Sequence, residues 1–134
     1  HEGLWLLRQA RFGAWDLPPD WVKMAPDGQL SLDTPQAPRF GYDAVRVPLY
    51  LIWSRRGREP AVAAARKWWS TAPQSDSPPA WLDLQSGAQA EYEASPGLKQ
   101  VIGLVRNRLS HSGTPQGYYD AALSNLASLA ERRA

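Results

Sequence analysis

The sequence has 134 residues, of which 43% are hydrophobic and 21% charged, as is ordinary for one small soluble domain. Its formal net charge is +2 and its basic side chains are scattered, so we expect neither a continuous basic face nor nucleic-acid binding. The absence of cysteine excludes disulfides, thiolate metal sites and cysteine nucleophiles, and the apolar runs are too short for a membrane span.

The first two segments predict the end of a helix followed by a long loop. Residues 1–12 have the apolar spacing of an amphipathic helix, and Gly13 is predicted to be its C-terminal cap. Because an initiator methionine and an N-terminal cap are absent, we expect the chain to begin within a domain. Residues 13–40 contain five prolines and the turn signal Asp27-Gly28. Loops of this length are uncommon and often functional.

Two helices are predicted next. Residues 42–56 have helical apolar spacing, with Asp43 expected to cap or start the helix and Gly57 to end it. The arginines near residue 56 suit the negative pole of the helix dipole. Residues 59–70 predict the second helix, because Pro60 fits a first helical turn.

The last third of the chain predicts a short hairpin and two more helices. Residues 81–93 alternate loosely and are predicted to turn at Ser86-Gly87. Ser95 suits the cap of a following helix, whose first position is a proline. A final helix is predicted over about residues 118–132. The predicted fold class is therefore all-α, with a short β-hairpin as a possible addition.

The string RFGYDAVRVP, residues 39–48, carries the strongest candidate for chemistry. It places Asp43 at the mouth of a helix, and Arg46 three residues later on the same helical face. Such an arginine would hold the carboxylate ionised and oriented. Tyr42 adds a hydroxyl and an aromatic plane, so the three side chains together fit a general base beside a sugar ring. The alternative is a helix cap with a weak surface ion pair.

The string YDAVRVPLYLIW resembles the YDA-x-R-x-P segment of glycoside hydrolase family 8. The upstream LPPDW and the downstream GYYDAALSNLASLA are similar to further family segments, in the same order. That family includes bacterial endoglucanases, and the likeness is to the periplasmic cellulases encoded with cellulose synthases. The resemblance implies an (α/α)6 barrel and an inverting mechanism with two carboxyl groups. It puts the general base at Asp43, with Tyr42 and Arg46 as the neighbours that position the base and the water.

Two features of the family have no match in these residues. Its general acid is a glutamate near the start of the catalytic domain, and its Asp-x-Asp signature lies in the middle. A barrel of this kind needs about twelve helices, whereas this chain predicts about five. We therefore expect residues 1–134 to be the C-terminal portion of a single catalytic domain, inactive alone and able to pair with the missing N-terminal part.

Three aromatic residues are candidates for stacking on sugar rings. Trp21 lies in the long loop, where contact and core positions are equally expected. Trp53 lies on an apolar helix face, so a core position is its main alternative. Tyr118 stands at the start of the final helix. Three other carboxylates are expected to cap helices or to accept hydrogen bonds in loops: Asp16, Asp20 and Asp120.

The sequence thus predicts an endo-β-1,4-glucanase of the cellulase type that acts on a β-glucan polysaccharide or oligosaccharide, with lichenan, chitosan and xylan as other family substrates. A non-catalytic helical module that binds polysaccharide or a partner protein is the alternative. Neither a metal nor a cofactor is expected, because inverting hydrolysis needs only carboxylates and water, and His1 and His111 form no recognisable metal pair. We expect a periplasmic or secreted protein.

Overall fold

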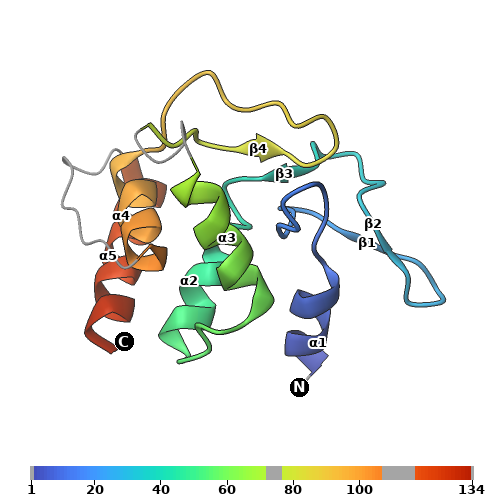
Figure 1. The fold of residues 1–134 in the computed structure, drawn as a ribbon, viewed down its shortest axis with the longest axis horizontal. Helices are drawn as coiled ribbons and strands as arrows, with labels where there is room; N and C mark the ends of the chain where they lie inside the picture. Colours follow the sequence, from blue (N-terminus) through green and yellow to red (C-terminus); the bar gives the residue numbers. More distant parts are fainter. Residues whose placement is uncertain (1, 72–76, 107–116, 134) are drawn as a thin grey trace.

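Nine helices and strands occur in residues 2–71, 77–106 and 117–133, which the computed structural model describes (Figure 1). They are α1 Glu2–Gln9, β1 Lys23–Met24, β2 Leu30–Ser31, β3 Arg39–Phe40, α2 Arg46–Trp53, α3 Pro60–Ser70, β4 Leu82–Asp83, α4 Pro96–Val105 and α5 Gly117–Arg133. The predicted mostly helical class is confirmed. No helix in these described ranges is long and apolar enough to cross a membrane.

The helices stand side by side beneath the antiparallel pair of β3 and β4 (Figure 1). The core lies between α2, α3, α4 and α5, where Leu49 and Val101 are fully buried. Trp69 of α3 packs against Phe40 of β3, with ring centroids 5.3 Å apart. The apolar helix faces therefore meet each other along the bundle and meet the strands at one end.

The predicted starts of α3 and α4 are confirmed. Both helices begin with a proline, which has no N–H to leave unsatisfied. The Ser95 hydroxyl accepts the N–H of Leu98 at 3.2 Å and so caps α4. The final helix is also confirmed, as α5, and Leu123 and Ala130 on its inner face are buried.

The helix α2 is shorter at both ends than the helix predicted over residues 42–56. Asp43 is not its cap: the cap residue is Val45, which makes no side-chain cap bond, and the residues before it form a turn. At the other end, Arg55 takes a left-handed φ of 61°, so the helix stops before Gly57. Local sequence signals placed both ends beyond the true helix.

The predicted long loop contains two tight hairpins. In the first, the backbones of Phe12 and Leu17 pair, and Gly13 lies in the turn with a φ of +78° instead of capping α1. In the second, β1 pairs with β2 around a turn that contains Gly28, whose φ is +87°. The Asp27-Gly28 signal predicted this turn, but strands of two residues are too short to show a pattern.

The hairpin predicted over residues 81–93 is present. The N–H of Gly87 donates to the carbonyl of Asp83 at 2.9 Å, and Leu82 bridges to Gln89 beyond the turn. The strand β4 pairs on its other side with β3, in the register Phe40 with Leu82. This second pairing joins segments far apart in the sequence and was not predicted.

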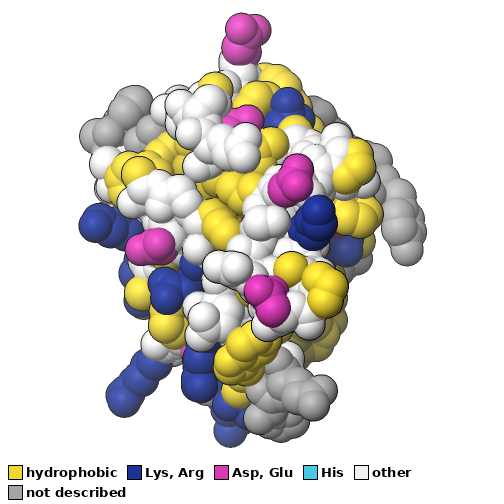
Figure 2. Space-filling view, turned by 90° about the vertical axis from the view of Figure 1, so that its right-hand side faces the viewer, with side chains coloured by type: hydrophobic (Ala, Val, Ile, Leu, Met, Phe, Trp, Pro, Cys, Tyr) yellow, Lys and Arg dark blue, Asp and Glu magenta, His cyan; other side chains and the backbone are white. Residues whose placement is uncertain are grey.

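Basic side chains gather at the end of the molecule opposite β3 and β4 (Figure 2). Arg55, Arg56 and Arg58 lie in the turn between α2 and α3, and with Arg8 and Glu59 they border a hollow of about 590 Å³. This basic end follows the C-terminus of α2, whereas residues 41–45 precede its N-terminus. The two are thus separated by the length of the helix.

A two-point ion pair joins α1 to the start of α3. The Arg8 guanidinium donates from Nε and Nη2 to the Glu59 carboxylate, at 3.0 and 2.8 Å. Hydrogen bonding to Arg8 holds the pKa of Glu59 below its usual range. A carboxyl with a lowered pKa stabilises the folded state while ionised, and this contribution is lost as pH falls through the lowered pKa.

We therefore expect Arg8→Gln to lower the melting temperature at neutral pH, and the difference from wild type to vanish at acid pH. Thermal unfolding followed by circular dichroism, from neutral pH down to pH values below the lowered pKa of Glu59, measures the effect. Arg58→Gln removes the same charge from an exposed neighbour and should show no such pH-dependent difference. A deficit in Arg8→Gln that stayed constant with pH would show that Glu59 does not carry it.

Candidate active site

The turn that carries Tyr42 and Asp43 is held by a carboxylate from the preceding loop. Asp20 Oδ1 accepts the backbone N–H groups of Gly41 at 3.2 Å, Asp43 at 3.0 Å and Ala44 at 2.7 Å. Burial raises the pKa of Asp20, and the three N–H donors offset only part of this rise. Asp20 therefore fixes the turn ahead of α2 from a distance, and its predicted hydrogen-bonding role in the loop is confirmed.

The Asp43 side chain is exposed on this turn. The predicted ion pair with Arg46 is wrong, because the pairs within the described part of the chain are Arg8–Glu59, Lys23–Asp33 and Lys99–Glu93. The reason is that α2 begins only at Arg46, so Asp43 lies before the helix and not on its face. The catalytic roles of Asp43, Tyr42 and Arg46 stay predictions.

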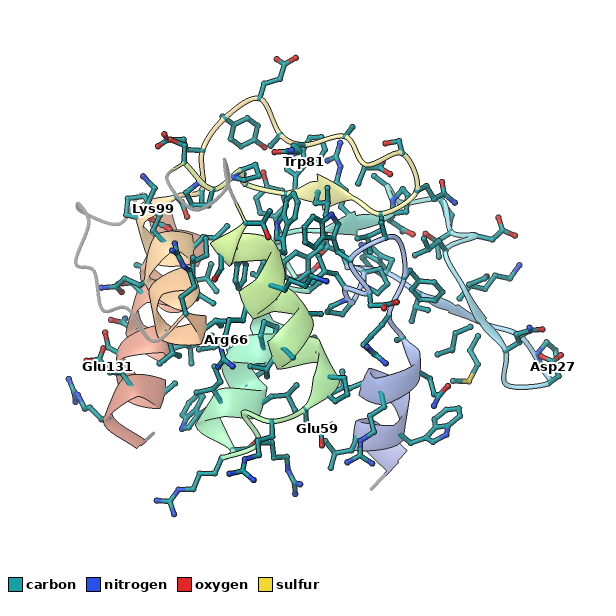
Figure 3. All side chains as sticks on the ribbon, in the orientation of Figure 1. Asp27, Glu59, Arg66, Trp81, Lys99 and Glu131 are labelled. Atoms are coloured by element: carbon teal, nitrogen blue, oxygen red, sulfur yellow. The ribbon has the colours of Figure 1, made fainter. Side chains whose placement is uncertain are left out.

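Four side chains form a connected cluster beside Asp43. The Tyr42 and Tyr92 hydroxyl oxygens are 2.6 Å apart, and Trp81 Nε1 donates to Tyr92 at 3.3 Å. The Arg39 guanidinium lies 3.8 Å from the centre of the Trp81 ring. Figure 3 shows Trp81 at the strand end of the molecule, above the helices.

Hydrogen bonding shifts the pKa values of the two tyrosines of this cluster in opposite directions. The pKa of Tyr42 is raised because its hydroxyl bonds to Tyr92, and the pKa of Tyr92 is lowered by the bonds from Tyr42 and Trp81. Either hydroxyl of this pair can be the donor of the bond between them. Local sequence patterns did not indicate Tyr92, Trp81 or Arg39, because hydrogen bonds between residues up to 50 positions apart leave no local signal.

A pocket of about 540 Å³ opens beside Tyr42. Tyr92 forms part of its wall, and Glu93 and Lys99, which form an ion pair of 3.1 Å, also line it. The buried Asp120 lines it as well. This size is in the range of small-ligand sites, and an aromatic wall with polar groups suits a sugar ring.

The predicted stacking residues lie in different places. Trp21 directly follows Asp20 and is 51% exposed, so its ring is free to contact a ligand. Trp53 ends α2, at the opposite end from Asp43, and is partly buried against the core, which matches its alternative. The Tyr118 side chain lies outside the described residues. Asp120 accepts bonds from the N–H of Gly97 at 2.6 Å and from a serine hydroxyl, so its prediction as a cap is confirmed.

Comparison with known sequences identifies relatives along the whole chain. The sequence model of the glycosyl hydrolases family 8 matches residues 1–133. A probable endoglucanase of Novacetimonas hansenii is 36% identical over 134 aligned positions, which cover 96% of this chain and 39% of that protein. An endoglucanase of Cellulomonas uda is 32% identical over 104 positions, covering 78% of this chain and 28% of that protein.

Solved structures match the fold. The endo-beta-1,4-glucanase CMCax of Acetobacter xylinum superimposes with a TM-score of 0.82 at 34% identity, over 98% of this chain and 43% of that one. Endoglucanase Cel10 of Klebsiella pneumoniae, a family 8 glycosyl hydrolase, superimposes with a TM-score of 0.87 at 30% identity and the same coverage. The chain thus spans about two-fifths of these relatives' lengths, and it belongs to glycoside hydrolase family 8.

Proposed function

We propose that residues 1–134 form the C-terminal portion of the catalytic domain of an endo-β-1,4-glucanase, with Asp43 as its general base. The observation that carries this proposal is an exposed carboxylate on a turn whose backbone is fixed by another carboxylate. A general base needs access to water and a fixed direction. Asp43 has both, because its side chain is exposed and Asp20 binds the backbone N–H groups of Asp43 and Ala44.

In the proposed reaction, the Asp43 carboxylate removes a proton from water, and the water oxygen attacks the anomeric carbon. A glutamic acid from outside residues 1–134 protonates the leaving oxygen. In inverting enzymes the two carboxyl groups stand roughly 6.5–9.5 Å apart, which leaves room for the water. We assign Arg46 and Tyr42 to positioning the water and the base, and this role does not require the Asp43–Arg46 ion pair.

We place the sugar chain across Tyr42, with one unit in the pocket beside it and with Trp21 and Tyr118 as further contacts. The hydroxyl of Tyr42 is held by Tyr92, which fixes the plane of its ring against the sugar. Flat rings bury the apolar face of a glucosyl unit, and polar groups such as Glu93 and Lys99 can bond its hydroxyls. Since a polymeric β-glucan lies outside the cytoplasm, we propose a periplasmic or secreted enzyme.

The remainder of the domain is the proposed partner of this chain. A groove of about 360 Å³ between α1 and α2 is lined by Leu4, Leu7, Val47 and Leu51, and the ring of Tyr50 beside it is 45% exposed. Apolar surfaces of this kind mark sites that another element covers. The matched relatives are more than twice as long as this chain, which supports a covering segment from the same protein.

The test is hydrolysis of carboxymethyl cellulose by the complete domain and by residues 1–134 alone. We expect new reducing ends from the complete domain only, with the α-anomer appearing first in proton NMR spectra, as inversion requires. Cellulose binding without hydrolysis by the complete domain would instead support a non-catalytic polysaccharide-binding module. Appearance of the β-anomer first would contradict the inverting mechanism while leaving the glucanase assignment intact.

A further inference from the structure

We propose that Asp20 is a positioning residue for catalysis, which acts through the turn that carries Asp43. The inference rests on the proposed function, because it concerns the orientation of the proposed base. Asp20 would not touch the substrate or the attacking water. Its effect would be to hold the backbone from which Asp43 projects.

The geometry concentrates three donors on a single oxygen. Asp20 Oδ1 accepts the N–H groups of Gly41, Asp43 and Ala44, so the peptide groups on both sides of Asp43 are bound to one atom. Charge-assisted hydrogen bonds of this kind are stronger than neutral ones. Fixing both peptide groups fixes the direction of the Cα–Cβ bond of Asp43, and with it the range of positions that its carboxylate can reach.

Asp20 is itself held in place from two sides. Its own N–H donates to the carbonyl of Arg39 in β3 at 2.7 Å. On its other side, the carboxylate lies close to Gly41. A Cβ added to Gly41 would lie 3.0 Å from Asp20 Oδ2 and 3.1 Å from Cβ of Trp81. Only glycine fits between Asp20 and Trp81 without displacing one of them. The strand β3, Asp20 and the turn therefore form one packed unit.

A purely structural helix cap would be arranged differently. Cap side chains bond N–H groups in the first turn of their helix, whereas α2 begins at Arg46, after all three of the bonded residues. The bonds therefore constrain the turn that bears Asp43 and not the helix beyond it. Burial also disfavours the ionised form of Asp20 and raises its pKa, so the carboxylate is kept here at an energetic cost.

The test compares three variants in the complete domain: Asp20→Ala, Asp20→Asn and Gly41→Ala. Asp20→Ala removes the acceptor and should lower kcat by about 100-fold, the size expected when a catalytic group is misplaced by about 1 Å. KM should change less than kcat, because Asp20 does not line the pocket and the Tyr42 hydroxyl on the same turn is also held by Tyr92. Asp20→Asn keeps an oxygen that can face the three N–H groups, and it should restore most of the lost kcat.

Gly41→Ala tests the positioning role if the Asp20→Ala variant does not fold. It retains the carboxylate and all three donors but displaces them by a few tenths of an ångström, so we expect a smaller fall in kcat than in Asp20→Ala, and a change in KM smaller than that in kcat. Melting temperatures of all variants, measured alongside, must exceed the assay temperature. Unchanged kcat in Asp20→Ala, or in Gly41→Ala where Asp20→Ala does not fold, overturns the positioning role.

Asp43→Asn separates the two proposals. If Asp43→Asn is inactive and Asp20→Ala keeps wild-type kcat, only the positioning role fails. If Asp43→Asn keeps wild-type activity, the base assignment itself fails, and any effect of Asp20 cannot act through Asp43.

Discussion

Asp43→Asn in the complete domain is expected to lower kcat for β-glucan hydrolysis by about 100- to 10,000-fold, the contribution that a general base makes. The amide has the shape of the carboxylate but cannot accept the proton of the attacking water. The backbone N–H of Asp43 donates to Asp20, and the substitution leaves this N–H in place. KM should therefore stay close to wild type, because substrate binding depends on the neighbouring aromatic rings and the pocket.

Reducing-sugar release at several substrate concentrations separates the two constants. Asp33→Asn is the matched control: it removes one carboxylate from an exposed loop position whose partner, Lys23, lies 3.5 Å away. That variant should keep wild-type kcat, since exposed ion pairs contribute little. A wild-type kcat in Asp43→Asn would show that Asp43 is not the general base. An equal loss of kcat in Asp33→Asn would point to a global effect on the fold.

Local signals in the sequence predicted the elements that depend on local chemistry. Ser95 and Pro96 marked the start of α4, Pro60 that of α3, and Gly87 the turn of the β4 hairpin, because each of these residues acts on its immediate neighbours. The start of α2 was misplaced for the opposite reason. Asp is a good cap residue, yet Asp43 lies in a turn before α2, and the N–H groups of this turn donate to the distant carboxylate of Asp20.

The parts of the site that escaped prediction are the long-range ones. Asp20 and Ala44 are separated by 24 positions, and Tyr42 and Tyr92 by 50. A sequence pattern reports neighbours along the chain, whereas these contacts depend on β3 bringing the loop and the hairpin together. Resemblance to the family supplied Asp43 as a candidate, but not the network that holds it.

A second large effect is expected where α4 crosses α5. Gly97→Ala should destabilise the domain by about 3 kcal/mol, because the added Cβ would overlap the backbone carbonyl and the carboxylate of Asp120. The carbonyl belongs to the backbone of α5 and cannot turn aside as a flexible side chain could. Relieving the overlap would require the helices to separate, which would also weaken the 2.6 Å bond from the Gly97 N–H to Asp120.

Urea unfolding midpoints measure this effect, with Gly3→Ala as the matched control in another helix. A Cβ on Gly3 would meet nothing within 4 Å, so alanine there should be neutral or stabilise the fold by up to about 1 kcal/mol. A small loss in Gly97→Ala, similar to that of the control, would mean that α4 and α5 can slide apart without cost. Since Asp120 and Leu98 also line the pocket beside Tyr42, such sliding would change the pocket and should then appear as a higher KM.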